Sequence, residues 1–432
     1  MRFAPVVYLL LSSALLCAQQ FSKSEKERVL DMLRVVSSDV EKNYYDARLH
    51  GVDWNARVRQ AKENINSAAS LNGAVSEIAA LLDSLNDSHT YFIPPPRPFV
   101  DDYGVEMQAI GDRCYVTRIH PKSDAQKKNL KVGDEILAVD GHPATRATLP
   151  RILYIYQTLR PQPGLRLTVA DGAGGRRDVD VMAKFTPSSV VKYSLLGGVN
   201  QRVRDRIKGI QLREPLFFER GDELLAVRIP AFSLDAIEID DIIGKMRHHK
   251  GVVLDLRGNP GGFEATLGRL LGGFFEYDLK VFDRVGRKSK EAVKVSGRHH
   301  DAFTGRFAVL IDSDSASASE LFARVIQLEK RGFILGDRSS GSVMEGRVFP
   351  HEYLLDSDVY YGSNITSADL LMSDGKSLEH VGVEPDVLIL PTPSDLAARR
   401  DPAMAKAAGL VGVKVTPEEA GTFFPIKGTS ED

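Results

Sequence analysis

Cysteine is nearly absent from this chain of 432 residues, in which only Cys17 and Cys114 occur. Two cysteines cannot form a disulfide framework, and this excludes a small fold held together by several bridges. Low-complexity tracts are lacking as well, and hydrophobic residues make up 43% and charged residues 26% of the chain. A chain of this composition buries enough apolar surface to fold, and its length predicts about three domains.

An excess of charge of one sign is also missing, because 56 basic residues face 58 acidic ones. No block of Lys and Arg supplies the concentrated positive field that a phosphate backbone requires, so nucleic acid is not an expected partner. The pairs His248-His249 and His299-His300 lack a partner pattern such as His-Glu-x-x-His. We therefore expect no metal site and no cofactor.

The longest apolar run near the amino terminus, Ala4 to Leu16, is shorter than the roughly 20 residues that a membrane span needs. Arg2 precedes this run, and the small residue Ala18 follows it. This pattern predicts a signal peptide over residues 1–18 and export to the periplasm or the extracellular space. Membrane association is expected only if Cys17 carries a lipid. The two leucines before Cys17 are a poor match to the small residues that processing for lipid attachment prefers.

Residues 19–96 are predicted to form a helical domain. Apolar residues recur at helical spacing between Glu25 and Asp46, and again between Val75 and Leu85. Three prolines at 94–96 end this pattern. Residues 97–188 contain short strand patterns at 114–119, 135–139, 165–170 and 177–182, with a helix near 149–159.

Residues 189–395 alternate buried apolar strands with helices, which indicates crossover connections and a largely parallel sheet. The expected strands are 225–229, 252–256, 307–311 and 333–335. One expected helix ends at 248, and two others span 266–275 and 318–330. After about Ser394 the periodicity weakens, so residues 396–432 are predicted to be a peripheral tail.

The segment from Gly305 to Glu320 has the pattern strand, turn, helix, and it places Ser317 at a helix amino terminus. The exposed N–H groups and the helix dipole there stabilise an oxyanion, with the amide of Ala318 as one donor. A purely structural explanation also exists, since Ser317 and Glu320 have the spacing of a capping box.

Two further patterns carry chemistry only in combination. The turn from Asp255 to Gly262 follows a buried strand, and its glycines allow a close approach of the backbone to an oxyanion, although they suit an ordinary turn equally well. Gly261 and Gly262 are both candidate donors, and we favour Gly261. His89 lies in a loop before the proline block, where a histidine is either a general base or a solvated polar residue.

Together these elements resemble the C-terminal-processing, or tail-specific, serine peptidases. The resemblance covers roughly residues 85–390 and depends on four motifs in the order of that family. It implies an α/β multidomain fold with a helical N-terminal domain, a PDZ-like β-rich domain, and a ClpP- and crotonase-like α/β catalytic core. The four motifs are Asp255 to Gly262, Ser315 to Glu320, Gly336 to Gly341, and Gly382 to Asp386.

The resemblance implies that Ser317, the middle serine of Ser-Ala-Ser-Ala-Ser-Glu, is the nucleophile. Many members of the family place a lysine base just after the glycine of the later loop, but this chain has Ser342 there. The tricorn-like branch instead uses a Ser-His pair near the amino terminus and a glutamate near the end of the core. Ser88, His89 and Glu379 match these positions, so the implied tetrad is Ser88, His89, Ser317 and Glu379, with Glu379 orienting the imidazole.

Residues 103–183 resemble a PDZ domain, through Tyr103-Gly104-Val105-Glu106 and Leu130 to Ile136. Such domains add an extended peptide to a sheet edge and hold its terminal carboxylate with loop amides. The resemblance thus implies peptide binding by Tyr103, Gly104 and Val105, and substrates with free or unstructured carboxyl termini. Asn129 stands where these domains commonly have glycine, and Asn tolerates the left-handed conformation better than most residues.

The expected function is that of an exported serine endopeptidase, which forms an acyl-enzyme on Ser317 with His89 as the base. A homo-oligomer is compatible with this function. The alternative is a non-catalytic peptide- or ligand-binding protein of the same fold, which keeps the groove and not the chemistry. A crotonase-like acyl-thioester enzyme would share the oxyanion geometry, but no nucleotide-binding signature is evident in the sequence.

Overall fold

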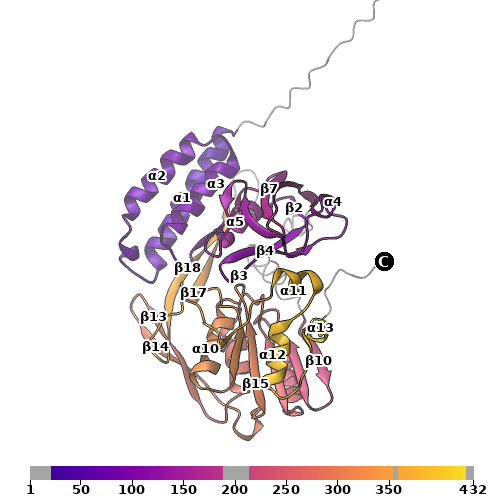
Figure 1. The fold of residues 1–432 in the computed structure, drawn as a ribbon. Helices are drawn as coiled ribbons and strands as arrows, with labels where there is room; N and C mark the ends of the chain where they lie inside the picture. Colours follow the sequence, from indigo (N-terminus) through magenta and orange to yellow (C-terminus); the bar gives the residue numbers. More distant parts are fainter. Residues whose placement is uncertain (1–20, 188–213, 354–358, 425–432) are drawn as a thin grey trace, which may run out of the picture.

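A computed structural model describes residues 21–187, 214–353 and 359–424 (Figure 1). The predicted signal peptide and Cys17 lie outside these ranges. Within them, every helix is too short or too polar to cross a membrane. The elements form an all-helical unit, a β-rich unit and a mixed α/β unit, which confirms the predicted α/β multidomain class.

The amino-terminal unit consists of helices α1 (Lys23–Asn43), α2 (Trp54–Ser67) and α3 (Leu71–Asp83), with a short turn of 3-10 helix at Leu49–Gly51. Helix α1 begins at a capping box in which the side chains of Ser22 and Glu25 satisfy each other's backbone N–H groups. Its apolar residues recur every three or four positions, so they share one buried face. The buried apolar residues of α1 are Val29, Met32, Leu33, Val36 and Val40.

The β-rich unit is a sheet with the order β3-β4-β5-β7-β8, in which β6 (His142–Pro143) pairs with β5. Its strands are β3 (Val105–Ile110), β4 (Arg113–Ile119), β5 (Glu135–Val139), β7 (Gly164–Ala170) and β8 (Arg176–Met182). Helix α4 (Asp124–Lys127) and helix α5 (Leu149–Tyr154), which continues as a π-helical turn over Ile155–Leu159, complete the unit. Strands β2 (Phe99–Asp102) and β9 (Lys184–Pro187) pair separately. The four strands and the helix that the sequence predicted here are confirmed.

Asn129 adopts φ +57°, as its position in the PDZ-like pattern predicted. Alternate residues of β7 point into the core of this unit, since Leu165, Leu167 and Val169 are buried. Strand β3 lies at one edge of the sheet.

The core sheet has the order β10-β11-β12-β15-β16-β19. It consists of β10 (Leu216–Arg220), β11 (Leu224–Arg228), β12 (Gly251–Asp255), β15 (Arg306–Ile311), β16 (Phe333–Gly336) and β19 (Val387–Leu388). All pairs except β10 with β11 are parallel, as the alternation of strands and helices predicted. Helices α8 (Ala236–Arg247), α9 (Glu264–Gly272) and α10 (Ala318–Leu328) cover one face.

The opposite face of the core sheet is covered by the carboxyl-terminal helices, which corrects the prediction of a peripheral tail. Helix α12 (Pro402–Leu410) buries Ala403, Met404 and Ala407 against Val253 and Leu310. The small residues of this helix weaken its hydrophobic periodicity, and this is why the sequence pattern missed it. The flanking helices are α11 (Pro393–Ala398) and α13 (Pro417–Ala420).

A second sheet connects the amino-terminal helices to the core, and the sequence did not predict it. Its long strand β18 (Val359–Met372) pairs with β17 (Met344–Tyr353), with β13 (Leu279–Gly286) and with β1 (Tyr91–Ile93), and β14 (Lys290–Val295) follows β13 at the edge. A 3-10 turn, His299–Asp301, leads back to β15. Figure 1 shows β17 and β18 running from the core toward the helices. The pairing of β1 with β18 brings the residues just before β1 next to the core.

Candidate active site

Ser317 lies between the end of β15 and the first residue of α10, where the sequence placed it. Its backbone has φ +56° and ψ −117°, a conformation that costs an L-residue on the order of 1–3 kcal/mol. The N–H of Ser317 donates to the carbonyl of Ser342 at 2.9 Å and to Oε2 of Glu320 at 3.0 Å. These two acceptors hold the strained turn in place. The contact with Glu320 is the backbone half of the expected capping box.

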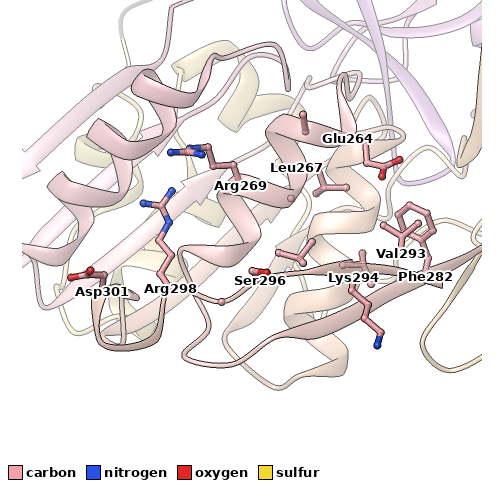
Figure 2. Close-up of a pocket in the computed structure, with 14 residues that line it drawn as sticks. Glu264, Leu267, Arg269, Phe282, Val293, Lys294, Ser296, Arg298 and Asp301 are labelled. Atoms are coloured by element: carbon pink, nitrogen blue, oxygen red, sulfur yellow. The ribbon is translucent and has the colours of Figure 1, made fainter.

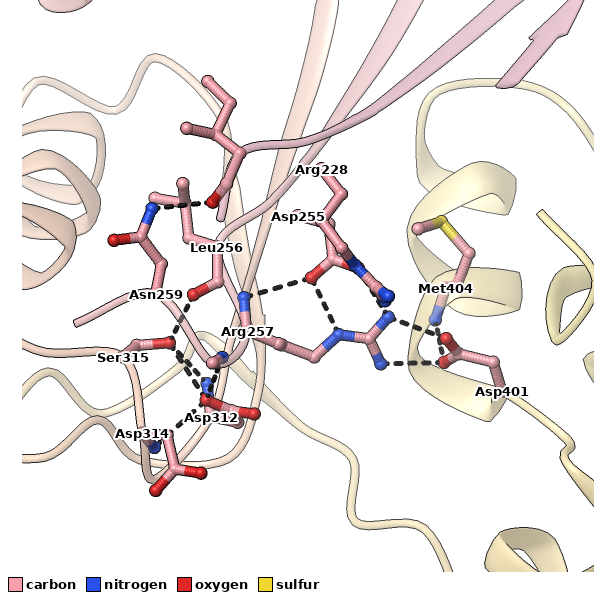
Figure 3. A network of polar contacts seen from close by, with 12 residues as sticks. Arg228, Asp255, Leu256, Arg257, Asn259, Asp312, Asp314, Ser315, Asp401 and Met404 are labelled. Carbon is pink, nitrogen blue, oxygen red and sulfur yellow. Dashed lines mark hydrogen bonds and ion pairs between the residues drawn. The ribbon is translucent and has the colours of Figure 1, made fainter. Parts of the chain in front are cut away.

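The serines on either side of Ser317 have structural roles. Ser315 is buried, and its hydroxyl donates to the carbonyl of Leu256 at 2.8 Å (Figure 3). Ser319 is also buried and donates to the carbonyl of Asn259 at 2.9 Å. Both therefore fasten the nucleophile turn to the turn after β12, whereas Ser317 is only half-buried.

Asn259 organises the turn that faces Ser317. Its side chain is fully buried, and its Oδ1 accepts the N–H of Gly261 at 2.8 Å while its Nδ2 donates to the carbonyl of Ile229 at 2.7 Å. The amide of Gly261 is thus already bonded, which corrects our preference for it as an oxyanion donor. Among the described residues, the N–H groups of Gly262 and Ala318 have no acceptor. Gly262 is therefore the better candidate beside Ala318.

The backbone of Gly261 comes very close to the nucleophile turn. It has φ +93°, and a Cβ built on it would lie 2.7 Å from Cβ of Ser317 and 2.9 Å from the backbone nitrogen of Ala318. A side chain at this position would therefore collide with Ser317. Glycine is required here for both its conformation and its size.

An ion-pair network holds the start of the same turn (Figure 3). Asp255 is fully buried between Arg228, at 2.6 Å, and Arg257, at 2.9 Å, and Arg257 also pairs with Asp401 at 2.7 Å. Burial alone would raise the pKa of Asp255, but the two guanidinium groups hold that pKa well below its usual range. Because Asp401 precedes α12, this network ties the carboxyl-terminal helices to the turn that faces Ser317.

His89 lies in a turn between α3 and β1 that Asp87 stabilises. Oδ1 of Asp87 accepts the N–H of His89 at 3.0 Å and the N–H of Thr90 at 2.7 Å. Residues of β18 hold the turn from the other side, since Thr366 donates to the same Oδ1 at 2.6 Å and Asn364 donates to the carbonyl of His89 at 2.5 Å. The turn thus depends on contacts with the core.

Ser88 connects His89 to Glu379. Its hydroxyl donates to Oε2 of Glu379 at 2.9 Å and lies 2.8 Å from Nδ1 of His89, and its N–H donates to Oε1 of Glu379 at 2.7 Å. The expectation that Glu379 itself orients the imidazole is therefore corrected, because the contact passes through Ser88. Three of the four implied tetrad residues are in direct contact.

The order of these contacts determines the tautomer of His89. A serine hydroxyl has one proton, which Ser88 gives to the acceptor-only carboxylate of Glu379, so Nδ1 of His89 must be the N–H donor to Ser88. Nε2 is then unprotonated in the neutral ring. Burial lowers the pKa of His89 below its ordinary value, and this outweighs the opposing charges of Glu379 and Asp87. At neutral pH the imidazole is therefore uncharged.

Ser317 and His89 are connected through the segment at Ser342 and Val343. Ser342 accepts the N–H of Ser317, and the next residue, Val343, donates its N–H to Oε2 of Glu379 at 2.8 Å. In the described part of the chain, no hydrogen bond joins the hydroxyl of Ser317 to the imidazole of His89. Catalytic contacts in a site without substrate are commonly long and tighten on binding.

The predicted peptide-binding loop of the PDZ-like unit is occupied by its own side chains. The N–H of Gly104 donates to Oδ1 of Asp102 at 2.7 Å, and Asp102 also pairs with His120 at 2.9 Å. Tyr103 is buried, and Val105 is a member of β3. The amide of Gly104 is therefore not free to hold a peptide carboxylate in this conformation.

Strand β3 and the loop after it contact the core close to the nucleophile turn. Ser313 donates to the carbonyl of Ala109 at 2.6 Å, and Gln108 donates to Asp312 at 2.7 Å. Arg146 pairs with Asp337 at 2.9 Å. The PDZ-like unit is thus docked on the loops that precede Ser317 and that follow β16.

A groove of about 770 Å³ between α9 and the strands β13 and β14 lies away from these residues (Figure 2). Figure 2 shows Arg269 and Arg298 beside it, and both pair with Asp240. None of the tetrad residues lines this groove. We therefore do not assign it to the chemistry of Ser317.

Sequence reasoning missed the roles of Asn259 and Glu320. Asn259 was seen as one residue of a Gly- and Pro-containing turn, and its polar side chain directly after a buried strand was the available signal. Glu320 was weighed only as a helix cap. Its full burial and its contacts with a distant loop, described below, depend on tertiary structure.

Comparisons with known proteins identify two parts of the chain. Residues 223–389 match the model of peptidase family S41, and residues 100–153 match the PDZ domain model. The tail-specific protease of Haemophilus influenzae is 25% identical over 319 residues, which cover 70% of this chain and 43% of that protein. The carboxy-terminal processing protease CtpB of Bacillus subtilis is 23% identical over 351 residues, 76% of this chain and 64% of that protein. The chain thus matches less than two thirds of each relative.

Solved structures share the fold. Mature CPAF, solved in complex with lactacystin, superposes with a TM-score of 0.62 at 16% identity, covering 87% of this chain and 96% of that chain. The photosystem II D1 C-terminal processing protease superposes with a TM-score of 0.50 at 18% identity, covering 86% of this chain and 94% of that chain. These structures show the fold, and the matches of residues 223–389 to peptidase family S41 and of residues 100–153 to the PDZ domain confirm the resemblance to the C-terminal-processing serine peptidases.

Proposed function

We propose that this protein is a serine endopeptidase in which Ser317 is the nucleophile and His89 is the general base. The observation that carries this proposal is the chain of contacts from Glu379 through Ser88 to Nδ1 of His89. It fixes the tautomer whose Nε2 accepts a proton. A histidine without this support would be a solvated surface residue.

In the proposed mechanism, Nε2 of His89 takes the hydroxyl proton of Ser317 while the oxygen attacks a peptide carbonyl. The tetrahedral oxyanion lies against the free N–H groups of Gly262 and Ala318, and the amino-terminal end of α10 adds its dipole. The imidazolium then protonates the leaving amine, which leaves an acyl-enzyme on Ser317. Water hydrolyses this ester by the same proton transfers in reverse order.

Ser88 and Glu379 act as positioning residues in this scheme. The carboxylate of Glu379 accepts the hydroxyl and the N–H of Ser88, so Ser88 cannot turn its proton toward His89. When the imidazole becomes positively charged, the oxygen of Ser88 accepts the Nδ1–H of His89. The carboxylate of Glu379 lies on the far side of Ser88. This arrangement stabilises the charge and keeps the proton on Nε2 directed toward the substrate.

The proposed substrates are polypeptides with free or unstructured carboxyl termini. The support is the PDZ domain match and the names of the relatives, which are tail-specific and carboxy-terminal processing proteases. Strand β3 is an edge strand and is the place where an extended peptide would add. For the loop at Gly104 to hold the carboxylate, the peptide must displace Asp102. Export to the periplasm or the extracellular space remains a prediction, because residues 1–18 lie outside the described ranges.

The proposal is tested by incubating the purified chain and its Ser317→Ala variant with an unstructured polypeptide that has a free carboxyl terminus. Mass spectrometry is expected to find internal cleavage by the wild type and none by the variant. Binding of the polypeptide by both forms without cleavage by either would instead identify a non-catalytic binding protein. Equal cleavage by both forms would overturn the role of Ser317.

A further inference from the structure

The segment from Ser339 to Val343 lies between two buried or nearly buried carboxylates. Ser339 donates its hydroxyl to Oε1 of Glu320 at 2.6 Å, and Gly341 donates its N–H to the same oxygen at 2.7 Å. Ser342 donates its N–H to Oε2 of Glu320 at 3.0 Å. At the other end, the N–H of Val343 donates to Glu379 at 2.8 Å.

The same two carboxylates hold the nucleophile and the base. Glu320 accepts the N–H of Ser317, and Glu379 accepts both polar groups of Ser88, which contacts His89. The segment is therefore fastened to the nucleophile turn by one carboxylate and to the base by the other. The carbonyl of Ser342, which accepts the N–H of Ser317 at 2.9 Å, adds a direct link.

Glu320 has unusual surroundings for a helix cap. Its side chain is fully buried and accepts four hydrogen bonds. One comes from the hydroxyl of Ser339, two come from the N–H groups of Gly341 and Ser342, and the last comes from the N–H of Ser317. A helix cap needs only the last of these. Burial raises the pKa of this carboxyl to about 6, against the effect of the four donors. Burial of a carboxylate costs free energy unless it is hydrogen-bonded, and here four donors compensate for that cost.

We infer that Glu320 is a positioning residue for the reaction, which sets the distance between Ser317 and His89 through the segment Ser339–Val343. The inference rests on the proposed function, since it assigns a role within that mechanism. It differs from the capping role, because a cap would stabilise α10 without affecting the base. The lysine position of many family members is Ser342, so here this segment supports the site through its backbone.

The isosteric variant Glu320→Gln tests this role. Each oxygen of Glu320 faces two donors, so either orientation of the Gln side chain directs its NH₂ group at a backbone N–H. Loss of one hydrogen bond to a charged acceptor corresponds to roughly a 10- to 100-fold effect. We expect labelling of Ser317 by a fluorophosphonate to be slower by about that factor. For peptide cleavage, kcat should fall while KM stays unchanged, because Glu320 does not contact the peptide.

Glu329→Gln is the matched control. It makes the same chemical change at the other end of α10, where, among the residues that the structure describes, the side chain of Glu329 accepts only the hydroxyl of Tyr277 at 3.1 Å. This variant should react as the wild type does. If Glu320→Gln does not fold, Ser339→Ala removes one of the four donors and should slow labelling by up to about tenfold, the effect of one ordinary hydrogen bond.

A double-mutant cycle separates positioning from general destabilisation. The double variant combines Glu320→Gln with Glu379→Gln. If both residues act on the same segment, the fold-decrease in rate of the double variant is smaller than the product of the fold-decreases of the two single variants. Labelling of a folded Glu320→Gln variant at the wild-type rate would overturn the inference, as would independent effects in the cycle. A wild-type chain that does not react at all would instead overturn the proposed function, and with it this inference.

Discussion

The turn that carries Ser317 and the turn that carries His89 are built in different ways. The first follows a buried parallel strand and opens a helix, and its neighbours Ser315 and Ser319 fasten it to the adjacent turn of the same sheet. The second lies between a helix and a short strand, and most of its support comes from residues more than 270 positions away, such as Asn364 and Glu379. Ser317 is placed by local architecture, and His89 is placed by the assembly of two units.

This difference predicts which changes affect each half of the site. Perturbing the core near Ser317 should act on folding and reaction together, because the turn is part of the main hydrophobic layer. Perturbing the contacts of Ser88 and His89 should lower the reaction rate with a smaller effect on the core.

Removal of either reacting group should have the largest effect. Ser317→Ala and His89→Ala are each expected to reduce peptide cleavage by at least about 10⁴-fold, since a nucleophile and its base act as one unit. Cleavage rates and circular dichroism of the variants measure this. Ser289→Ala, an exposed serine in the turn between β13 and β14, is the control and should retain activity. Substantial activity in His89→Ala would show that another group is the base.

The contacts of the base should come next. Ser88→Ala and Glu379→Gln are each expected to lower kcat by roughly 10²-fold, because a positioned base contributes typically 10²–10⁴-fold and these variants misplace it without removing it. The double variant should be no slower than the slower single variant, since both residues act through one chain of contacts. Fully multiplicative effects would mean that Glu379 acts on His89 by another route. Kinetics of a fluorogenic peptide would supply the rates.

On the core side, Asp401→Asn should lower stability. The variant keeps the cap of α12, because an Asn oxygen can still accept the N–H of Met404, but it removes one of the two carboxylates that pair with the partly buried guanidinium of Arg257. The expected loss in the free energy of unfolding is about 1–3 kcal/mol, the value of a charged hydrogen bond. Denaturant titration measures it. Asp180→Asn, which breaks the exposed pair with Arg166, should leave the midpoint unchanged.

The pH dependence should report the environment of His89. Only the neutral imidazole is a base, so activity is present above the pKa of His89 and is lost as the pH falls through it. Because burial lowers this pKa, activity should persist to a more acidic pH than an ordinary histidine allows. Asp87→Asn removes a negative charge that raises the pKa of His89, so the acid limb should move to still lower pH. A shift to higher pH would contradict this assignment.

The smallest effect is expected at the PDZ domain. Asp102→Asn keeps an acceptor for the N–H of Gly104 but removes the negative charge that a peptide carboxylate must displace. The affinity for a peptide with a free carboxyl terminus should rise by a few-fold, as for removal of one partly exposed charge. Fluorescence anisotropy of a labelled peptide measures it, and the same peptide with an amidated end should show no gain. Unchanged binding of both peptides would place the carboxylate site elsewhere.

The sequence predicted the core half of the site well, because its signals are local. Apolar runs alternating with helices indicated the parallel sheet, and the pattern from Phe307 to Glu320 placed Ser317 correctly at the start of α10. The resemblance to a peptidase family then added His89 and Glu379. Their contact through Ser88 was not predictable, since it joins residues 291 positions apart.

The remaining differences also have physical reasons. Whether Gly261 or Gly262 donates to an oxyanion depends on where the side chain of Asn259 points, which a sequence does not show. The second sheet escaped prediction because its strands come from three separate parts of the chain. Helix α12 escaped because alanine gives little periodic contrast, although it buries well against a sheet.

The most direct test of the central claim is the labelling of wild type and His89→Ala by a fluorophosphonate, with the modified residue identified by mass spectrometry. Modification of Ser317 is expected in the wild type, and loss of that reaction is expected in His89→Ala, in a protein that remains folded. Modification of Ser317 at equal rates in both forms would contradict the assignment of His89 as the base that activates it.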